Sequence, residues 1–385
     1  MTDAKAREEL TALREAIDRQ DLKLIEVIRE RLDLVARAAK VKAELGEGSR
    51  SLSREDFLLS DRARLAAAHH LPEGLIEDLL KRLLRESYKE SGERHFACSF
   101  LKEHPGQTVK PVVLVGGKGG MARIFRQYFE ASGYPVRIFG HHDYAKAREL
   151  LKGALAVMVC VPIDVTEEVI ATLSPYLDKE TILMDITSVK GPIVKKMLAC
   201  HKGPVLGLHP MFGPDIRGMV KQVIVNAGGR DTEKSAFLLE QFRLWGAKVV
   251  DCDPEEHDKA MSIIQALRHF TTYCYGLFLA RVHPDLRSIL ALSSPIYHLE
   301  LLMVGRLFAQ DPRLYADIIM ASERNAELIG SYLECIREEL DTVRRKDHAA
   351  FKERFLEARA YFGDSAESFL KESGALLARV NDDRR

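Results

Sequence analysis

The stretch VVLVGGKGGMARIF, residues 112–125, decides the fold of the central part of the chain. Its apolar start predicts a buried strand, and its end has helical spacing. Between them lies Gly117-x-Gly119-x-x-Ala122, in which the first glycine makes a tight turn and the second lets a pyrophosphate approach free amides at the helix start. We therefore predict a dinucleotide site in preference to an ordinary glycine-rich turn. The residues expected to form it are Gly117, Lys118, Gly119, Gly120, Met121 and Ala122.

The composition indicates a soluble globular protein of two or three domains. The 385 residues include 57 Lys plus Arg and 57 Asp plus Glu, so no overall charge favours nucleic acid or a membrane as a partner. Six widely spaced cysteines show no CxxC or zinc-type spacing, which is typical of a reducing compartment. The N-terminus MTDAKAREEL lacks the apolar core of a signal peptide. We expect a cytoplasmic protein without a metal site.

Periodicity divides the chain into three folded parts. Helical spacing without proline or glycine from about residue 8 to 46 predicts one long helix, and two shorter helical patterns follow at 54–68 and 73–90. From residue 111 β-branched runs alternate with helical segments, which predicts parallel βαβ units in a doubly wound sheet. After Asp253 the pattern is helical. The predicted parts are a three-helix all-α domain at 1–91, an irregular linker at 92–110, an α/β Rossmann-type domain at 111–253 and an all-α domain at 254–385.

The long N-terminal helix carries basic residues on the face that we expect to be buried. Apolar side chains define this face at 100° per residue: Leu10, Leu13, Ile17, Leu24, Ile25, Leu32, Val35 and Ala39. Arg14, Arg31 and Lys42 lie in the same arc, as does Asp21. Since a buried cation without a partner is costly, these residues either pair with internal carboxylates or bind an anionic ligand.

A fourth cation, Arg54, lies at the start of the second helix, where it can meet the first. Arg31 and Lys42 are roughly 16 Å apart along the helix axis, so their long side chains can converge on a small dianion. Arg14 lies some 25 Å from Arg31, too far to share that site, and would serve a neighbouring chain. This spacing predicts an intertwined homodimer.

The pattern LREAID…ERLDLVARAAKVKAELG…SREDFLL…LLRESY resembles the all-helical chorismate mutases from about residue 10 to 91. By this resemblance Arg14 of the other subunit, Arg31 and Arg54 bind the substrate carboxylates, and Lys42 stabilises the breaking ether oxygen. The rearrangement is pericyclic, so placing chorismate and stabilising charge on that oxygen would supply catalysis without a nucleophile.

Four further positions compare with the mutase pattern. Glu55 and Ser87 match polar contacts of that family. The family often has an acid at the position of Ser51 and a Gln or Glu at that of Ser91, and the role of Ser91 stays open.

The strand after the glycine turn carries no acid at the expected place. An acid about twenty residues on normally binds the adenosine ribose of NAD. Here the sequence reads Phe139-Gly140-His141-His142-Asp143, with glycine at that position. The fingerprint thus leaves NAD and NADP both open, and Asp143 is an alternative ribose contact.

Two polar segments follow predicted strands, where ligands bind in a doubly wound sheet. They are TSVKGP at 187–192 and GLHPMFGP at 207–214. His209 is placed to act as a base, or else caps backbone in a turn. Downstream, Arg306 lies in an apolar stretch, where it either binds a ligand or pairs with Glu300 or Asp311.

The segments VGGKGGMARIF, SVKGP, LGLHPMFGPD, IQALRHF and VGRLFAQDPRLYADIIMASERN resemble prephenate dehydrogenases from about residue 110 to the end. The resemblance implies NAD as cofactor, His209 as the base that takes the ring hydroxyl proton, and Arg306 as the residue that holds the ring carboxylate. The resemblance also implies a C-terminal dimerisation domain and tyrosine as a feedback inhibitor. Its further pocket positions are Ser188, Lys190, His269 and Tyr315. Lys190 could instead be a solvated loop cation, and His269 and Tyr315 could instead be packing residues with a satisfied polar tip.

Together the two resemblances indicate a bifunctional chorismate mutase/prephenate dehydrogenase of tyrosine biosynthesis. Such an enzyme converts chorismate to prephenate, and prephenate with NAD to 4-hydroxyphenylpyruvate and CO2. Two alternatives stay open: a dehydrogenase that prefers arogenate and carries a vestigial mutase, or N-terminal helices that serve only dimerisation. Three cations on a buried face favour a catalytic role, because a pure dimer seam rarely places them there without acidic partners.

Overall fold

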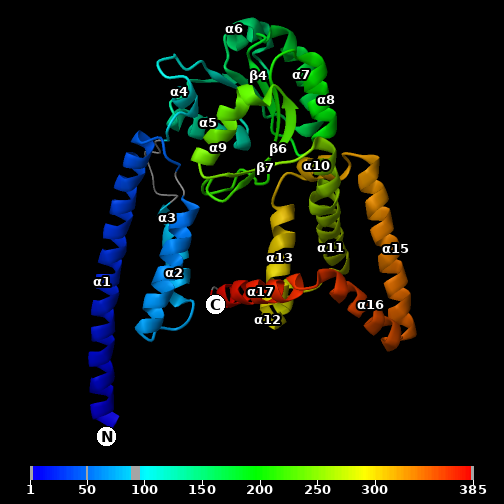
Figure 1. Ribbon diagram of the computed structural model, residues 1–385. Coiled ribbons are helices and arrows are strands. Elements are labelled where there is room, and N and C mark those ends of the chain that lie inside the picture. Colours follow the sequence, from blue (N-terminus) through cyan, green and yellow to red (C-terminus); the bar gives the residue numbers. More distant parts are fainter. Residues whose placement is uncertain (1–2, 49–50, 88–95, 383–385) are drawn as a thin grey trace. The chain divides into compact units, whose positions relative to one another are not determined.

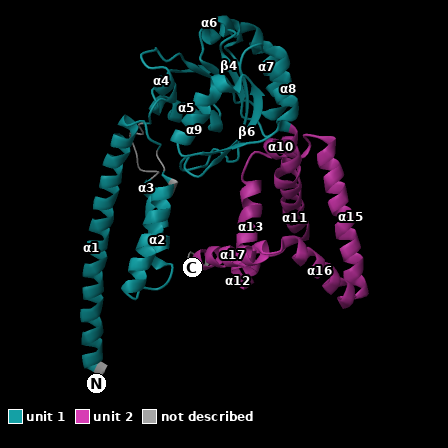
Figure 2. Ribbon diagram, viewed as in Figure 1, with its two compact units in different colours: residues 1–254 teal, residues 255–385 magenta. Residues whose placement is uncertain are grey.

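The computed structural model describes residues 3–48, 51–87 and 96–382 (Figure 1). The chain divides into two compact units, residues 1–254 and 255–385 (Figure 2). The first unit holds the N-terminal helices and the sheet, and the second is helical. No helix among the described residues is long and apolar enough to cross a membrane.

Three helices form the N-terminal part, as the periodicity predicts: α1 (Asp3–Glu44), α2 (Leu52–Ala68) and α3 (Leu75–Ser87). The single long helix α1 contains no proline or glycine, and it ends before Gly46, whose φ of +71° lies in the left-handed region that favours glycine. The next helix, α2, ends before His70, also at positive φ, and Gly74 at +80° precedes α3.

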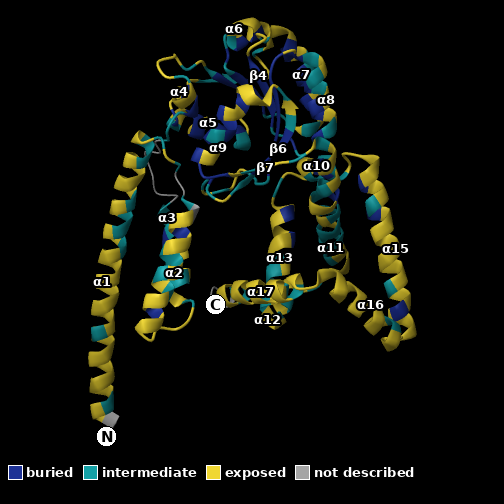
Figure 3. Cartoon of the chain, viewed as in Figure 1, coloured by how far each residue is buried: buried dark blue, intermediate teal, exposed yellow. Residues whose placement is uncertain are grey.

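A seven-stranded sheet forms the centre of the first unit. Its strands are β1 (Val112–Val115), β2 (Val136–Phe139), β3 (Ala156–Val159), β4 (Ile182–Asp185), β5 (Val205–Pro210), β6 (Val223–Arg230) and β7 (Lys248–Asp251). The order is β2-β1-β3-β4-β5-β6-β7, and the first five strands are parallel. Strands β1, β3 and β4 are buried at every position, as expected for a parallel sheet covered on both faces (Figure 3).

Helices cover both faces of the sheet. They are α4 (Ser99–Glu103), α5 (Gly120–Ala131), α6 (Ala147–Leu151), α7 (Ile163–Leu173), α8 (Gly191–Cys200) and α9 (Ala236–Leu244), with short 3₁₀ turns η1 (Tyr144–Lys146), η2 (Ser174–Tyr176) and η3 (Thr232–Ser235). One core packs α4, α5 and α9 on the sheet around the fully buried Trp245. A second core, on the other face, packs α6, α7 and α8. This arrangement places the carboxyl ends of the parallel strands, and the loops that follow them, at one edge of the domain.

The sheet differs from the sequence prediction at its C-terminal side. We predicted parallel strands throughout, but β6 runs antiparallel to β5. The chain between Pro210 and Val223 forms no helix, and without a crossover helix it returns in the opposite direction. The edge strand β7, which pairs with β6, was not predicted.

The predicted irregular linker also contains structure. Residues 99–103 form α4, and the side chain of Phe100 is buried in the core of the sheet domain. Gln241 Oε1 accepts hydrogen bonds from Ser99 N and Ser99 Oγ, each at 2.9 Å, and Tyr134 Oη accepts one from Phe100 N. This part of the segment therefore packs as part of the nucleotide-binding domain, whereas residues 92–95 of it lie outside the described residues.

The second unit is helical throughout its described residues, as predicted. Its helices are α10 (Pro254–Met261), α11 (Arg268–Val282), α12 (Leu286–Leu292), α13 (Pro295–Phe308), α14 (Pro312–Ile319), α15 (Glu323–Arg345), α16 (His348–Phe362) and α17 (Ser365–Asp382). A π-helical turn, η4 (Ser262–Leu267), joins α10 to α11 without a break. Helices α11 and α13 pack closely because Gly276 faces Phe308, and Tyr275 Oη donates to Tyr297 Oη at 3.0 Å.

Candidate functional site

A cavity of about 370 Å³ lies among α1, α2 and α3. Its polar lining consists of Arg31, Lys42, Ser51, Arg54, Glu55 and Ser87. Of the lining residues that the structure describes, three are cations and one, Glu55, is an acid, so the cavity suits an anionic ligand. Every mutase residue predicted for one chain lines this cavity. Ser51, which departs from the family pattern, lines it as well, whereas Ser91 lies outside the described residues.

Arg14 does not line this cavity. It lies on the same uninterrupted helix as Arg31, seventeen residues earlier, which corresponds to about 25 Å along the axis. The apolar residues around it are open to solvent in the single chain, with Leu13 55% and Ile17 59% exposed (Figure 3). The prediction that this face is buried is therefore wrong for one chain alone, because α2 and α3 are too short to cover the N-terminal half of α1.

The glycine turn connects β1 to α5 and forms a tight backbone cradle. The residue at positive φ is Gly116, at +77°, one position before the glycine that we predicted to make the tight turn. A Cβ on Gly116 would lie 2.8 Å from the carbonyl oxygen of Cys160, and one on Gly117 would lie 2.7 Å from the Ile138 side chain. A Cβ on Gly120 would lie 2.7 Å from Pro214. Neighbouring backbone at Gly116, and neighbouring side chains at Gly117 and Gly120, thus leave no room for a Cβ at these three positions.

A second cavity, of about 730 Å³, opens beside this turn. Its lining comes from the turn, from the end of β2 and the start of η1, and from α7 with the residues before it: Val115, Gly116, Lys118, Phe139, Gly140, His141, Tyr144, Val161, Pro162, Val165, Glu168, Val169 and Thr172. Of the other predicted turn residues, Ala122 is buried against the sheet and Met121 packs beside the core. The cradle, the first turn of α5 and an apolar-walled cavity of this size fit an adenine dinucleotide.

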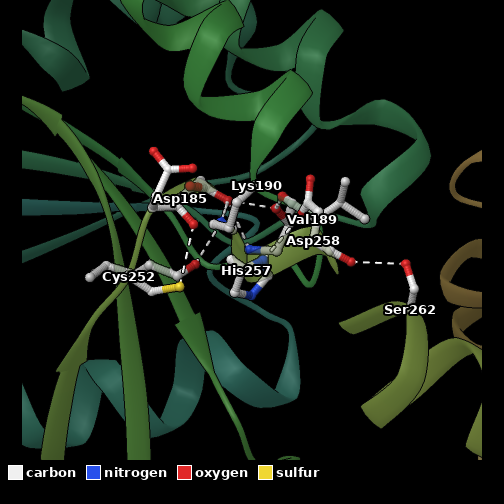
Figure 4. Close-up of polar contacts among 10 residues, drawn as sticks. Asp185, Val189, Lys190, Cys252, His257, Asp258 and Ser262 are labelled. Carbon is white, nitrogen blue, oxygen red and sulfur yellow. Dashed lines mark hydrogen bonds and ion pairs between the residues drawn. The ribbon is translucent and has the colours of Figure 1, made fainter. Parts of the chain in front are cut away.

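The predicted catalytic segments of the first unit follow β4 and β5. Lys190 forms an ion pair with Asp185, both side chains being fully buried, and Lys190 Nζ also donates to the carbonyl oxygen of Leu208 at 2.6 Å (Figure 4). Lys190 is therefore not a solvated loop cation. Ser188 is half-buried in the same loop, and His209, at the end of β5, is buried beside the carbonyl that Lys190 binds.

Asp185 is the polar residue of this site that we did not predict. Its Oδ2 atom accepts hydrogen bonds from Thr187 N at 2.9 Å and Thr187 Oγ1 at 2.6 Å, in addition to the contact with Lys190. An acid at the end of the apolar run TILMD was the available signal, since a buried carboxylate needs a cation or several donors. Asp185 holds the loop that carries Ser188 and Lys190.

The predicted residues of the second unit lie on three helices. His269, in the first turn of α11, follows the π-helical turn, and such turns are frequent at functional sites. Its ring packs edge-on against Tyr315 of α14, with centroids 4.9 Å apart. Burial, and then the charge of Arg268, lower the pKa of His269 to about 4, so the ring is neutral near pH 7. Arg306 is exposed on α13, and the Asp311 carboxylate caps α14 by accepting from Arg313 N.

Two polar contacts lie within the helical segment at the start of the second unit. His257 Nδ1 lies 2.8 Å from Asp258 Oδ1, and Ser262 Oγ donates to the carbonyl oxygen of Asp258 at 2.9 Å (Figure 4). These contacts tie α10 to the π-helical turn, and so fix the helix on which His269 lies.

The chain matches three family models. Residues 13–91 match chorismate mutase type II, residues 138–225 match the nucleotide-binding domain of prephenate dehydrogenase, and residues 253–357 match its dimerization domain. A helical mutase and a prephenate dehydrogenase are thus joined in one chain.

Full-length relatives identify the particular family. The chain is 47% identical to the T-protein of Enterobacter agglomerans, over 98% of this chain and 99% of that protein. It is 44% identical to the T-protein of Haemophilus influenzae, over 97% and 98%. It belongs to the T-proteins, the bifunctional chorismate mutase/prephenate dehydrogenases, and has both activities in tyrosine biosynthesis.

A solved structure shows the same fold for the dehydrogenase part. Prephenate dehydrogenase from Aquifex aeolicus, in complex with hydroxyphenyl propionate and NAD+, superposes with a TM-score of 0.54 at 18% identity, covering 66% of this chain and 98% of that one. The predicted fold class, with helical mutase, nucleotide-binding and dimerisation domains, is confirmed.

Proposed function

We propose that the cavity of α1, α2 and α3 binds chorismate and performs the mutase reaction with Arg31, Arg54 and Lys42. The observation that carries this proposal is the gathering of these three cations in one cavity with Glu55 and Ser87. Arg31 and Arg54 bind the substrate carboxylates, and Lys42 stabilises negative charge on the ether oxygen as its bond breaks. Glu55 and Ser87 position the rest of the substrate. Because the reaction is pericyclic, orientation and charge stabilisation suffice.

We propose further that the second cavity binds a nicotinamide dinucleotide, with NAD+ as a cofactor that accepts hydride from prephenate. His209 takes the proton of the ring hydroxyl, and Arg306 holds the ring carboxylate, which leaves as CO2 when the ring becomes aromatic. Ser188, His269 and Tyr315 provide further substrate contacts, whereas Lys190, which is fully buried with Asp185, positions the loop that carries Ser188. The ion pair with Asp185 and the hydrogen bond from Lys190 to the carbonyl oxygen of Leu208 hold this loop beside His209, which supports the proposal.

One experiment separates the two activities. Purified protein is given chorismate with and without NAD+, and chorismate loss is followed beside NADH formation. We expect Lys42→Ala to abolish chorismate consumption but keep oxidation of supplied prephenate, and His209→Asn to do the reverse. Lys23 is an exposed cation on α1 outside the cavity, so Lys23→Ala is the matched control and should leave both rates unchanged. If both reactions disappear together in either variant, separate sites are ruled out.

We also propose that the active form is a homodimer in which Arg14 completes the mutase cavity of the partner. The exposed apolar face around Arg14 and the match to a dimerization domain support it. Arg14→Ala and Lys42→Ala should each be inactive as mutases. Mixing the two after subunit exchange should restore activity, because one site of each hybrid dimer then has both side chains intact. No recovery in hybrids isolated with two different tags would refute the shared site.

A further inference from the structure

An ion pair joins the mutase helices to the nucleotide-binding domain. Lys221 Nζ, in the loop between β5 and β6, lies 3.8 Å from Oε2 of Glu55, in the first turn of α2. The Glu55 side chain is 7% exposed and lines the mutase cavity, whereas the Lys221 side chain is 59% exposed. Both residues belong to the first compact unit. A cation from the dehydrogenase part of the chain therefore approaches an acid of the mutase cavity.

The nucleotide-binding domain holds the backbone of Lys221. Its φ of +66° is a left-handed conformation, which residues other than glycine adopt at a cost. Lys221 N donates to the carbonyl oxygen of Gly246 at 3.0 Å, and the fully buried Met219 donates from its backbone N to Tyr128 Oη at 2.9 Å. Such a backbone persists only where its surroundings fix it, so the loop presents the lysine side chain from a fixed base.

The charges around Lys221 direct its ammonium group towards Glu55. Lys221 lines a neighbouring cavity, of about 460 Å³, that shares Leu84 with the mutase cavity. The other charged residues described in that lining are cations: Lys81, Arg82, Arg85 and Arg217. Lys81 and Arg82 lie near acids of their own helix, Asp78 at 3.9 Å and Glu86 at 3.0 Å. Repulsion by these cations and attraction by Glu55 act on Lys221 in the same direction.

Glu55 places a negative charge in a cavity that must bind a dianion. The cations proposed to bind the substrate charge are Arg31, Lys42 and Arg54, and a carboxylate beside them competes with the substrate for their positive charge. We propose that Lys221 is a positioning residue of the mutase site. It fixes the Glu55 carboxylate and offsets its charge from outside the three helices, so that the cavity cations remain available to chorismate. The inference rests on the proposed mutase function of this cavity.

Mutase kinetics of the full-length protein test the role of Lys221. Lys221→Gln should raise the KM for chorismate about fivefold and change kcat less than about twofold, because Lys221 aids the binding of a dianion without contacting the reacting atoms. Lys221→Arg restores the charge and should keep the KM within about twofold of the wild-type value. Oxidation of supplied prephenate should be unchanged in both variants. A wild-type KM in Lys221→Gln would overturn the inference.

Two further variants separate the ion pair from other effects. Lys221→Gly removes the charge but suits the left-handed backbone, so the KM should rise as in Lys221→Gln while the urea midpoint of unfolding does not fall. Lys81→Ala removes another cation of the neighbouring cavity and should leave the KM unchanged. An equal rise in Lys81→Ala would refute a specific role of Lys221. If Lys42→Ala still consumes chorismate at the wild-type rate, the proposed mutase cavity itself fails. If Lys42→Ala is inactive and Lys221→Gln is normal, the role of Lys221 alone fails.

Discussion

Replacing Asp185 with asparagine should destabilise the nucleotide-binding domain strongly. The substitution keeps the size of the side chain but leaves the ammonium group of Lys190 buried without its counter-charge, and both residues have 0% exposed side chains. Removing one partner of a buried ion pair costs about 3–5 kcal/mol. With a urea m-value of about 2 kcal/mol per molar, the unfolding midpoint should fall by roughly 2 M.

The chain offers its own probe and control for this measurement. Trp245 is the one tryptophan in the sequence and is fully buried in this domain, so its fluorescence reports unfolding of the domain and not of the helical parts. The exposed pair of Arg126 and Glu130, on α5 of the same domain, is the comparison, and Glu130→Gln should cost about 0–1 kcal/mol.

A double variant identifies the cause. Asp185→Asn with Lys190→Met removes both charges, and it should be less destabilised than Asp185→Asn alone because no uncompensated charge remains buried. The reasoning is refuted if Asp185→Asn shifts the Trp245 midpoint no more than Glu130→Gln does.

Two further predictions follow from groups whose pKa is shifted. His269, with its pKa lowered to about 4 by burial and then by Arg268, stays neutral between about pH 4 and 6.5, whereas the unfolded chain binds a proton there. The free energy of unfolding therefore keeps the full contribution of His269 above pH 6.5 and loses it as the pH falls towards 4. Histidine NMR titration should find this low pKa, and a value near 6.5 would contradict the prediction. Burial raises the pKa of the Cys160 thiol, and the negative charge of Asp185 raises it further. The thiol of Cys335, in contrast, is exposed to solvent. A thiol reagent should label Cys335 in the native protein and Cys160 on unfolding, as peptide mass spectrometry can measure, and equal native labelling would disagree.

Elements with strong local patterns could be predicted from the sequence. Strands β1 and β3 are continuous apolar runs, and α1 is long and free of proline and glycine, so each is evident without tertiary information. The same holds for the mutase cations, because helical spacing alone places Arg31 and Lys42 on one face. The structure brings Arg54 and Ser87 to that face from α2 and α3.

Elements that depend on distant contacts could not be predicted. The short helix α4 has five residues and is held by Gln241 and Tyr134, which lie far along the chain. The edge strand β7 reads KVVD and is mostly exposed, so it lacks the apolar run of an inner strand. Asp185 gains its partner only when the loop after β4 folds back, which no spacing rule anticipates.

The glycine turn shows what a sequence motif can and cannot predict. Its spacing located the turn, but it could not distinguish a glycine needed for its backbone angle from one needed for space. Only Gly116 has a left-handed backbone, whereas Gly117 and Gly120 are required because Ile138 and Pro214 lie against them. The residue between the glycines is free of both constraints. Position 118 can therefore carry an exposed lysine at no cost to the turn.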